Sequence, residues 1–425
     1  MSFIAETQRA VKWYPPAYDI RIEDQPIPQL QEPDDAIVKV TLAGLCGSDL
    51  HIYRGHGGVE SPIICGHEFV GEIISLGKSF HYGVTGRPEG YAELKVGDKV
   101  IAPFTVSCRE CHSRCVHSTL FGSPSLPGGQ AQYVRVPKAG GTLFKVDSIT
   151  SLLPPSESGR GLEDSSLLLL ADILPTGVFA AIQALQHPRI APFVQGTPFP
   201  YNGYIPSGLL AENPVPLPQE DRSLTVAVVG LGPVGICATV SLLDMLTDLR
   251  RTSALQYRVV AIDPTEARRS KMQSVFAAIS EPTDAGSFVV ASIEEGKEVI
   301  SQWTDSLGCN VVLEVVGNNS ALTLAYDLIR PFGLISSVGV HSSPPVPYTG
   351  KQLYDKNVSF DFGRCPVRAT LPFAAKLLLK RQDIFGGVGE EASLVDKIVG
   401  IEEAKEVYEE FDKGRCGKVL FNPWK

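Results

Sequence analysis

The chain has 425 residues, more than one hydrophobic core usually organises, so we expect two domains. Its net charge of −9 at pH 7, with Lys and Arg scattered along the sequence, argues against nucleic acid or an anionic membrane surface as a partner. The apolar run LLLLADIL at 167–174 falls well short of the roughly 20 residues of a membrane span, and the first residues lack a signal-peptide core. Because the nine cysteines also show no disulfide pattern, we expect a soluble cytoplasmic protein.

The first part of the chain is expected to be rich in β-strands. Short apolar or alternating runs are separated by glycine, proline and charge, which favours an antiparallel barrel or sandwich; the runs are AIVKVTL, EFVGEIISL, DKVIAPF and AQYVRV. Helical spacing begins at Glu163, in SSLLLLADIL and GVFAAIQALQ. The proline-rich residues 188–222 have no apolar period and predict a long surface loop or a partly disordered segment.

From residue 223 onward, strands alternate with helices. The strand LTVAVVG precedes the helix VGICATVSLLDML, and YRVVAID precedes a helix from Thr265 to about Ala278. CNVVLEVVG and GLISSVGV are further strands, with the helix ALTLAYDLI between them. This order predicts a doubly wound parallel sheet. The mixed tail from about Gly363 fits neither a continued winding nor a separate domain, so it could rejoin the first part of the chain.

The segment VAVVGLGPVG carries a glycine pattern typical of dinucleotide binding. Gly230, Gly232 and Gly235 follow an apolar strand and open a helix, and Pro233 and Val234 complete the predicted site. The first glycine permits a tight turn, the second lets backbone amides approach a pyrophosphate, and the third allows close helix packing. The helix N-terminus then faces the anion. The alternative is an ordinary glycine turn.

The next strand ends at Asp263, whose carboxylate would accept hydrogen bonds from the adenosine ribose and repel a 2′-phosphate. This favours NAD over NADP. The gap from Gly235 to Asp263 is longer than the usual roughly 20 residues, and Arg268 and Arg269 could hold a phosphate. NADP therefore remains an alternative cofactor. The simpler interpretation of the two arginines is that they are solvated charges on a helix face.

Two short segments contain residues that zinc prefers as ligands. A catalytic zinc takes three protein ligands, thiolate and imidazole among them, and leaves one position for water or substrate. GLCGSDLH supplies Cys46, Ser48, Asp49 and His51, and ICGHEFVG supplies Cys65, His67 and Glu68. Each of these residues alone would more often be explained by packing.

Taken together in order, GLCGSDLH, GHEFVG, VGDKV, GGQAQYVRV, LLLADILPTG, GLGPVG and EVVG closely resemble the zinc-dependent medium-chain dehydrogenase/reductase family. The likeness is nearest to its alcohol and formaldehyde dehydrogenase-like fungal and bacterial members. It implies a GroES-like catalytic domain at residues 1–174, continued by 363–425. It also implies a Rossmann NAD-binding domain at 175–362 that carries the proline-rich insertion.

The resemblance implies that Cys46, His67 and Asp172 are zinc ligands, since the formaldehyde dehydrogenase-like members carry aspartate at the third position. Glu68 would lie just behind the metal, as an occasional ligand or as a group that supports the ligands. Asp49 would orient the His67 ring, because the free ring nitrogen of a ligating histidine needs a partner. Without the resemblance, Asp172 would simply be a carboxylate at a helix terminus.

The implied reaction is hydride transfer between an alcohol and NAD, since zinc stabilises an alkoxide or polarises a carbonyl. In the family, the positions of Ser48 and His51 relay the proton to solvent, although His51 read alone would be an exposed loop histidine. The segment GRCPVR resembles the return to the catalytic domain, and Arg364 or Arg368 could reach the cofactor pyrophosphate.

Three cysteines in SCRECHSRC depart from the family pattern. Members of this kind usually hold a structural zinc with four cysteines, and here Cys108, Cys111 and Cys115 are one short. His112 or His117 would have to complete a tetrahedral site, and neither lies at an expected spacing. We favour a shortened lobe without structural zinc over a rebuilt Cys3His site, and the expected compartment disfavours a disulfide.

Three functions follow from this reading. The first is an NAD-linked zinc alcohol dehydrogenase or carbonyl reductase acting on a small molecule; glutathione-dependent formaldehyde oxidation is a narrower form that no residue fixes. The second is a relative that uses zinc as a Lewis acid without redox chemistry, and the third is a non-catalytic binding protein. The family also implies a homodimer or homotetramer, and insertions near 81–93 and 188–222 could alter assembly or substrate range.

Overall fold

The computed structural model describes residues 6–56, 58–111, 115–151, 162–195, 223–253, 255–280, 287–342 and 345–425. The chain divides into two compact units. The discontinuous unit comprises Met1–Pro175 and Pro366–Lys425, and the inserted unit comprises Thr176–Cys365. Among the described residues, no single helix is long and apolar enough to cross a membrane; the helices on either side of Asp172 pass that test only as a pair bent by 49°.

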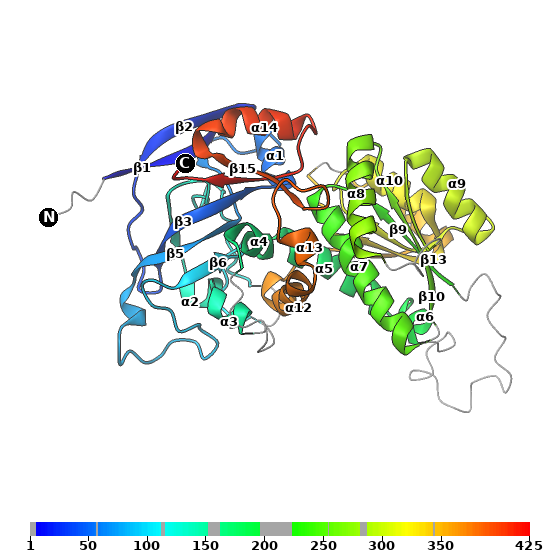
Figure 1. The fold of residues 1–425 in the computed structure, drawn as a ribbon, viewed down its shortest axis with the longest axis horizontal. Coiled ribbons are helices and arrows are strands. Elements are labelled where there is room, and N and C mark those ends of the chain that lie inside the picture. Colours follow the sequence, from blue (N-terminus) through cyan, green and yellow to red (C-terminus); the bar gives the residue numbers. More distant parts are fainter. Residues whose placement is uncertain are drawn as a thin grey trace. The chain divides into compact units, whose positions relative to one another are not determined.

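The described strands of the discontinuous unit form two sheets (Figure 1). One sheet has the order β15-β16-β3-β5-β6-β8 with β7 paired to β3, and the other has the order β2-β1-β4. All pairs are antiparallel except β15 with β16. The strands are β1 (Thr7–Tyr14), β2 (Asp19–Pro26), β3 (Ala36–Leu45), β4 (Ile63–Ile64), β5 (Phe69–Leu76), β6 (Lys99–Ala102), β7 (Tyr133–Val136), β8 (Phe144–Lys145), β15 (Val395–Gly400) and β16 (Lys418–Asn422).

Short helices connect and cover these sheets. The α-helices are α1 (Gly47–Tyr53), α2 (Ala139–Thr142), α3 (Val146–Thr150), α4 (Asp164–Leu168), α12 (Val367–Lys380), α13 (Gln382–Phe385) and α14 (Ala404–Asp412). The 3-10 helices are η1 (Lys78–Phe80), η3 (Leu169–Ala171) and η7 (Ile401–Glu403). The helix α5 (Ile173–Leu185) leads from the discontinuous unit into the inserted unit.

The last segment of the chain completes the discontinuous unit. β16 pairs with β3, so that Val419 lies opposite Leu45. One buried cluster joins Trp13 near the start of the chain to Tyr408 and Phe421 near its end. Because large aromatic side chains bury much apolar area, this cluster ties the two chain segments into one fold.

The inserted unit is a parallel sheet with the strand order β11-β10-β9-β12-β13-β14. Its strands are β9 (Ser223–Val229), β10 (Gln256–Ile262), β11 (Phe288–Ala291), β12 (Cys309–Glu314), β13 (Ile329–Ser337) and β14 (Ser359–Phe362). Its helices are α6 (Ala191–Gln195), α7 (Pro233–Thr252), α8 (Glu266–Ile279), α9 (Ile293–Thr304), α10 (Asn319–Leu328) and α11 (Gly350–Lys356).

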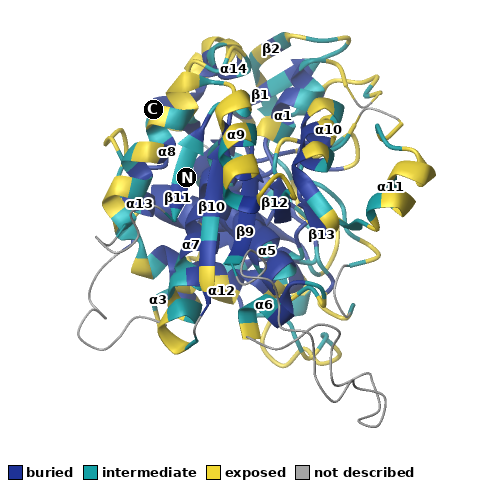
Figure 2. Ribbon diagram, turned by 90° about the vertical axis from the view of Figure 1, so that its right-hand side faces the viewer, coloured by how far each residue is buried: buried dark blue, intermediate teal, exposed yellow. Residues whose placement is uncertain are grey.

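The central strands of this sheet are covered on both faces. β9 and β12 read as nearly continuous apolar runs and are buried along almost their whole length, as parallel strands between two helix layers must be. The helices α7 and α8 lie on one face and α9 and α10 on the other (Figure 1). The colouring of Figure 2 shows buried strands beneath helices whose outer faces are exposed. The predicted fold class, a β-rich part joined to a doubly wound parallel sheet, is confirmed.

One part of the proline-rich stretch is a helix, which corrects the expectation of a loop. The residues of α6 follow Ile190, and both Ile190 and Ala191 are buried. Pro192 lies in the first helical turn, where its missing N–H costs no hydrogen bond. Residues 196–222 of the predicted loop lie outside the described residues.

Candidate metal centre and cofactor site

The first helix places two of the predicted site residues. Cys46 is the N-cap of α1, and the Asp49 side chain reaches back to accept a hydrogen bond from the Cys46 backbone N–H at 2.9 Å. The other Asp49 oxygen lies 3.2 Å from His67 Nδ1. One buried carboxylate therefore fixes the helix start at Cys46 and the ring of His67.

His67 lies in the turn between β4 and β5. The preceding Gly66 has φ +90°, a conformation that favours glycine, and a Cβ there would come within 2.5 Å of the Gln130 side chain. Gln130 in turn donates to the Gly44 carbonyl at 2.9 Å and accepts from the Tyr408 hydroxyl at 2.8 Å. The turn that presents His67 is thus braced against β3 and α14.

Asp172 stands at a break between helices. It has φ −151° and ψ −69°, outside the helical region, and separates η3 from α5. The apolar residues before it, Leu167–Ala171, are completely buried. This break ends the helical run and leaves the Asp172 carboxylate facing His67.

These elements bring four potential ligands together. Ligand atoms of Cys46, His67, Glu68 and Asp172 all lie within 4.8 Å of one another. Asp172 Oδ2 is 3.3 Å from His67 Nε2 and 3.8 Å from Cys46 Sγ. A tetrahedral zinc with ordinary bonds to N, O and S separates its ligand atoms by about 3.3–3.7 Å. The spacing and the donor types therefore fit zinc.

The charges around this cluster favour a cation. Burial alone would lower the pKa of His67, but the Asp49 and Asp172 carboxylates outweigh it and raise that pKa well above its ordinary value. Burial and the Glu68 carboxylate raise the pKa of the Cys46 thiol. Because a buried thiolate is costly among carboxylates, a bound metal ion is what would hold Cys46 in its anionic form.

Glu68, the fourth member of the cluster, forms a buried ion pair with Lys418. The two side chains are 1% and 0% exposed, and Lys418 also donates to the Leu45 carbonyl at 3.1 Å. Burial would lower the pKa of Lys418, but the Glu68 carboxylate raises it, so the ammonium stays charged. The second Glu68 oxygen, Oε1, is buried and has no hydrogen-bond partner among the described residues.

Ser48 and His51 extend from the cluster toward the surface. The Ser48 hydroxyl lies 3.4 Å from Cys46 Sγ and 3.3 Å from His67 Nε2. His51 follows three residues later on α1, so both side chains lie on one helix face. The ring centroid of His51 is 6.2 Å from that of the exposed His56.

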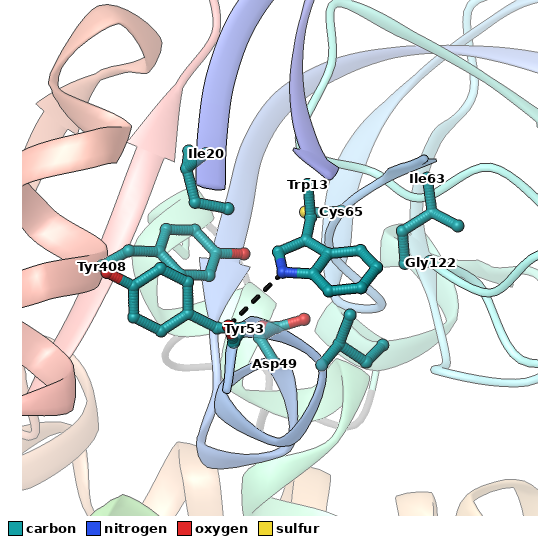
Figure 3. Close-up of a pocket in the computed structure, with 9 residues that line it drawn as sticks. Trp13, Ile20, Asp49, Tyr53, Ile63, Cys65, Gly122 and Tyr408 are labelled. Carbon is teal, nitrogen blue, oxygen red and sulfur yellow. Dashed lines mark hydrogen bonds between the residues drawn. The ribbon is translucent and has the colours of Figure 1, made fainter. Parts of the chain in front are cut away.

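A small cavity lies on the other side of Asp49 (Figure 3). Its volume is about 10 Å³, room for at most one water molecule, and Trp13, Tyr53 and Tyr408 stand around it. Cys65 also lines it, and burial raises the pKa of this thiol to about 12. Cys65 is therefore a neutral, packed thiol in the structure, although it is only two residues from His67.

In the inserted unit, the predicted glycine turn joins β9 to α7. Gly230 has φ +99°, and a Cβ on Gly235 would lie 1.9 Å from the Gly230 carbonyl oxygen. Gly232 is the N-cap of α7, with Pro233 as the first helical residue and Val234 after it, and a Cβ on Gly232 would meet nothing within 4 Å. The turn is therefore closed by protein on one side and open at Gly232, as approach of a pyrophosphate requires.

Asp263 follows β10 and is linked to this turn. Its Oδ2 accepts the Leu231 N–H and its Oδ1 accepts the Thr265 N–H, both at 2.8 Å. Arg268 lies 3.5 Å from Oδ2, and Arg269 donates to the Asp263 carbonyl at 2.9 Å. The carboxylate is thus fixed beside the glycine turn, with Arg268 directed to it.

The structure places Arg368 within the discontinuous unit. Its guanidinium donates to the carbonyl of Gly141 and lies 4.3 Å from the centroid of the Phe144 ring. Burial and the charge of Arg109 lower the pKa of Arg368 to about 10. Contact of Arg368 with a cofactor stays a prediction, as does any role for Arg364.

The three remaining cysteines form a second group. Cys108 Sγ lies 3.5 Å from Cys111 Sγ and 3.3 Å from Cys115 Sγ, and all three thiols are free. Among the described residues no fourth histidine, cysteine or carboxylate joins them. His112, one of the two predicted fourth ligands, lies outside the described residues.

Sequence reasoning missed several residues that support the cluster, Lys418 and Gln130 among them. Lys418 had a readable signal, because it begins the apolar strand KVLF and a lysine in a buried strand needs a partner. Gln130 had none, since its role depends on contacts with Gly44 and Tyr408, which are distant in the sequence.

Comparisons with known proteins agree with this geometry. Residues 32–148 match the alcohol dehydrogenase GroES-like domain, and residues 251–377 match the zinc-binding dehydrogenase domain. The chain is 34% identical to a zinc-type alcohol dehydrogenase B of Aspergillus flavus, over 97% of this chain and 81% of that protein. It is 40% identical to a medium chain reductase/dehydrogenase of an Acremonium species, over 82% of this chain and 98% of that protein.

Among solved structures, an alcohol dehydrogenase from Thermus sp. ATN1 superposes with a TM-score of 0.71 at 26% identity. The superposition covers 97% of this chain and 99% of that one. The two domain matches and the two relatives agree with the buried thiol, imidazole and carboxylate described above, which are ligands that zinc prefers. The chain belongs to the zinc-dependent medium-chain dehydrogenase/reductase family.

Proposed function

We propose that this protein transfers a hydride between an alcohol or carbonyl substrate and NAD(H), with zinc held by Cys46, His67 and Asp172. The observation that carries the proposal is the buried cluster of one thiol, one imidazole and one carboxylate at zinc-like spacing. Zinc bound there would act as a Lewis acid on the substrate oxygen, and a nicotinamide would accept or donate the hydride.

The side chains of α1 would move the proton. The Ser48 hydroxyl lies beside two proposed ligands, where it can accept a hydrogen bond from a substrate hydroxyl and pass its own proton on. His51 lies further along the same helix face, toward the exposed His56, and an imidazole titrates near neutral pH. Asp49 binds no substrate in this scheme and holds His67 in one ring orientation.

For the cofactor, we favour NAD over NADP. Asp263 would meet the adenosine ribose, and its carboxylate is fixed beside the glycine turn by two backbone N–H groups. Arg268 is directed to that carboxylate. The positive charge of Arg268 is therefore partly neutralised, which makes the arginine less suited to hold a 2′-phosphate. The glycine turn itself fits a pyrophosphate, because Gly232 leaves open space at the start of α7.

The substrate class follows the relatives. The Aspergillus flavus protein is named as a zinc-type alcohol dehydrogenase, and other relatives are sorbitol dehydrogenases and a formaldehyde dismutase. We therefore propose a small alcohol, polyol or aldehyde as the substrate. Assembly into a homodimer or homotetramer, as the family implies, is part of the same proposal.

The test is turnover and zinc content of matched variants. The zinc-loaded protein is mixed with NAD and a panel of primary alcohols, secondary alcohols, polyols and formaldehyde, and NADH absorbance is followed. We expect Cys46→Ser and Asp172→Asn to lose bound zinc and to reduce turnover to background. Cys65→Ser is the matched control, because this nearby thiol faces a small cavity and should keep both zinc and activity. Full zinc and turnover in Cys46→Ser would contradict the proposed ligands.

A further inference from the structure

Three free thiols lie together on a loop that takes no part in the proposed reaction. Cys108 Sγ is 3.3 Å from Cys115 Sγ and 3.5 Å from Cys111 Sγ, so it lies within contact distance of both neighbours. Cys108 and Cys115 also share a second contact, because the backbone N–H of Cys108 donates to Cys115 Sγ at 3.3 Å. The contact between Cys108 and Cys115 is thus the shorter of the two and is supported by the backbone.

The base of this loop is fixed by backbone pairing. Thr105 and Leu120 form an antiparallel bridge, and the Val106 N–H donates to the Thr119 carbonyl at 2.9 Å. These bonds hold the chain on both sides of the three cysteines. The cysteines between them therefore stay neighbours when one of their side chains rotates.

A small movement would close a bond between two of the sulfur atoms. The S–S length of a disulfide is about 2.05 Å, so Cys108 Sγ and Cys115 Sγ need to approach by about 1.3 Å. Rotation of one side chain to another staggered position moves its sulfur atom further than that. The pair can therefore be linked with the base of the loop in place.

Reagents in solution can reach this pair. Cys115 is partly exposed, whereas Cys108 is 4% exposed. Burial raises the pKa of the Cys108 thiol, but the Glu110 N–H and the neighbouring cysteines outweigh it and lower that pKa to about 7. In its ionised form the pair shares one proton, which the Cys115 thiol donates toward Cys108 Sγ. An ionised sulfur thus lies beside an accessible one, as in redox-sensitive thiol pairs.

We propose that Cys108 and Cys115 are a reversible oxidation site, which a peroxide closes into a disulfide and a thiol reductant opens. The Cys115 sulfur passes its proton to Cys108 and attacks hydrogen peroxide; the O–O bond breaks, hydroxide leaves and Cys115 becomes a sulfenic acid. Cys108 then attacks the Cys115 sulfur, the S–S bond forms, and the sulfenic oxygen leaves as water with the Cys108 proton. In sum, two thiols are oxidised and one peroxide is reduced to two water molecules.

The absence of a disulfide framework elsewhere agrees with a reversible bond at this loop. Where a reducing pool keeps cysteines as thiols, the disulfides that do form are usually transient, and catalytic or redox-sensing. Partly exposed disulfides are of this labile kind. The inference goes beyond the proposed function, because it uses neither the proposed zinc ligands nor the glycine turn.

The experiment maps disulfides in the full chain by mass spectrometry. The zinc-loaded protein is dialysed against a mild chelator, treated with a few equivalents of hydrogen peroxide, blocked with N-ethylmaleimide and digested. We expect a linked peptide pair that joins Cys108 to Cys115, with the loss of two reactive thiols and their recovery in dithiothreitol. Cys111→Ser keeps both partners and should form the same link, whereas Cys108→Ser should lose it.

Cys416 provides the matched control for exposure. It is partly exposed, as Cys115 is, but burial raises its pKa to about 11. We therefore expect Cys416 to stay reduced under the same treatment. Cys416→Ser should form the link between Cys108 and Cys115 as fast as the wild type does.

Three results would overturn the inference. Oxidation of Cys416 as fast as Cys115 would show that exposure alone decides which thiol reacts. A bond from Cys108 to Cys111 in the wild type would show that the wrong pair is assigned. Thiols that resist peroxide because a metal ion survives the chelator on the loop would show a metal site instead. These results need no turnover, so the proposed function is tested separately.

Discussion

Among single residues, Lys418 sets the charge balance behind the candidate metal centre. It is the cation that neutralises Glu68, and Glu68 contributes one of the four clustered ligand atoms. With Cys46 and Asp172 both anionic, zinc alone would leave Glu68 as an uncompensated buried charge. Burial raises the pKa of Glu68 and the Lys418 ammonium counters that rise, so the lysine favours the ionised carboxylate and offsets its charge.

Removing this lysine should be strongly destabilising. We expect Lys418→Met to lose about 3–5 kcal/mol of unfolding free energy, because it leaves Glu68 buried and unpaired. The double variant Lys418→Met with Glu68→Gln should recover much of that loss. Lys351→Met is the control, because Lys351 is exposed and its ion pair with Asp355 lies at the surface. Urea unfolding of the zinc-free wild type and of these three variants measures the four free energies. A double variant as unstable as the single one would show that the two charges are not coupled.

At the scale of elements, periodicity predicts which segments form strands and helices but not where they break. SSLLLLADIL reads as one helical run, and in the structure it is split at Asp172, with α4 and η3 before the break and α5 after it. The break follows from tertiary contacts of Asp172 with His67 and Cys46, which are more than a hundred residues away. The sequence pattern also did not predict the short strands β11 and β14, because four residues are too few to show a periodicity.

The candidate site was predictable for a different reason. Apolar patterns say nothing about a thiol, an imidazole and a carboxylate meeting in space, and the grouping of Cys46, His67 and Asp172 was inferred from family motifs alone. The glycine turn could be read from local physics, since only small residues fit where Gly235 meets the Gly230 carbonyl. The hydrogen bonds of the buried Glu314 could not, because they depend on the alignment of β12 with β13. The groups around its carboxylate are the N–H groups of Val316 and Gly317, the Ser337 hydroxyl and the His341 ring.

The β12–β13 contact through Glu314 should make the stability of the inserted unit depend on pH. Burial would raise the pKa of Glu314, but His341, Ser337 and the backbone donors outweigh it. The pKa of Glu314 is therefore lower in the folded protein than its ordinary value of 4.5, so the unfolded chain binds a proton first as the pH falls. The stabilisation is fully present above about pH 5 and is lost as the pH falls through the folded-state pKa. The wild type should have a larger free energy of unfolding than Glu314→Gln at pH 7. The difference between the two free energies should become smaller below about pH 4.5.

Circular dichroism of urea unfolding between pH 7 and pH 4 measures this gap. Glu295 serves as a control, because its pKa is also lowered but its side chain is exposed, so Glu295→Gln should show a much smaller gap. Stability curves for wild type and Glu314→Gln that run parallel over the whole range would contradict the prediction.

For the whole molecule, the number of zinc ions per chain distinguishes one metal site from two. Cys46, His67 and Asp172 offer three ligands with an open position, whereas Cys108, Cys111 and Cys115 lack a fourth ligand among the described residues. Burial raises the pKa of the Cys108 thiol, but the Glu110 N–H and the neighbouring cysteines outweigh it and lower that pKa to about 7. Because only three ligands surround this partly ionised thiol, we expect weak and exchangeable metal binding there.

We therefore expect about one zinc per chain by atomic absorption after dialysis against a mild chelator. Cys108→Ser should leave that number unchanged, and Cys46→Ser should bring it near zero. About two zinc ions in the wild type, falling to one in Cys108→Ser, would show that the three-cysteine group holds a metal after all.

The discontinuous unit also has a consequence for how the protein is made. The inserted unit is one continuous stretch, Thr176–Cys365, so it can fold while the ribosome is still adding residues. The partner of Glu68 arrives 350 residues later, when Lys418 emerges with β16. Until then Glu68 lacks its lysine partner, and the edge of β3 that later pairs with β16 has open backbone hydrogen-bonding groups that could pair with another chain.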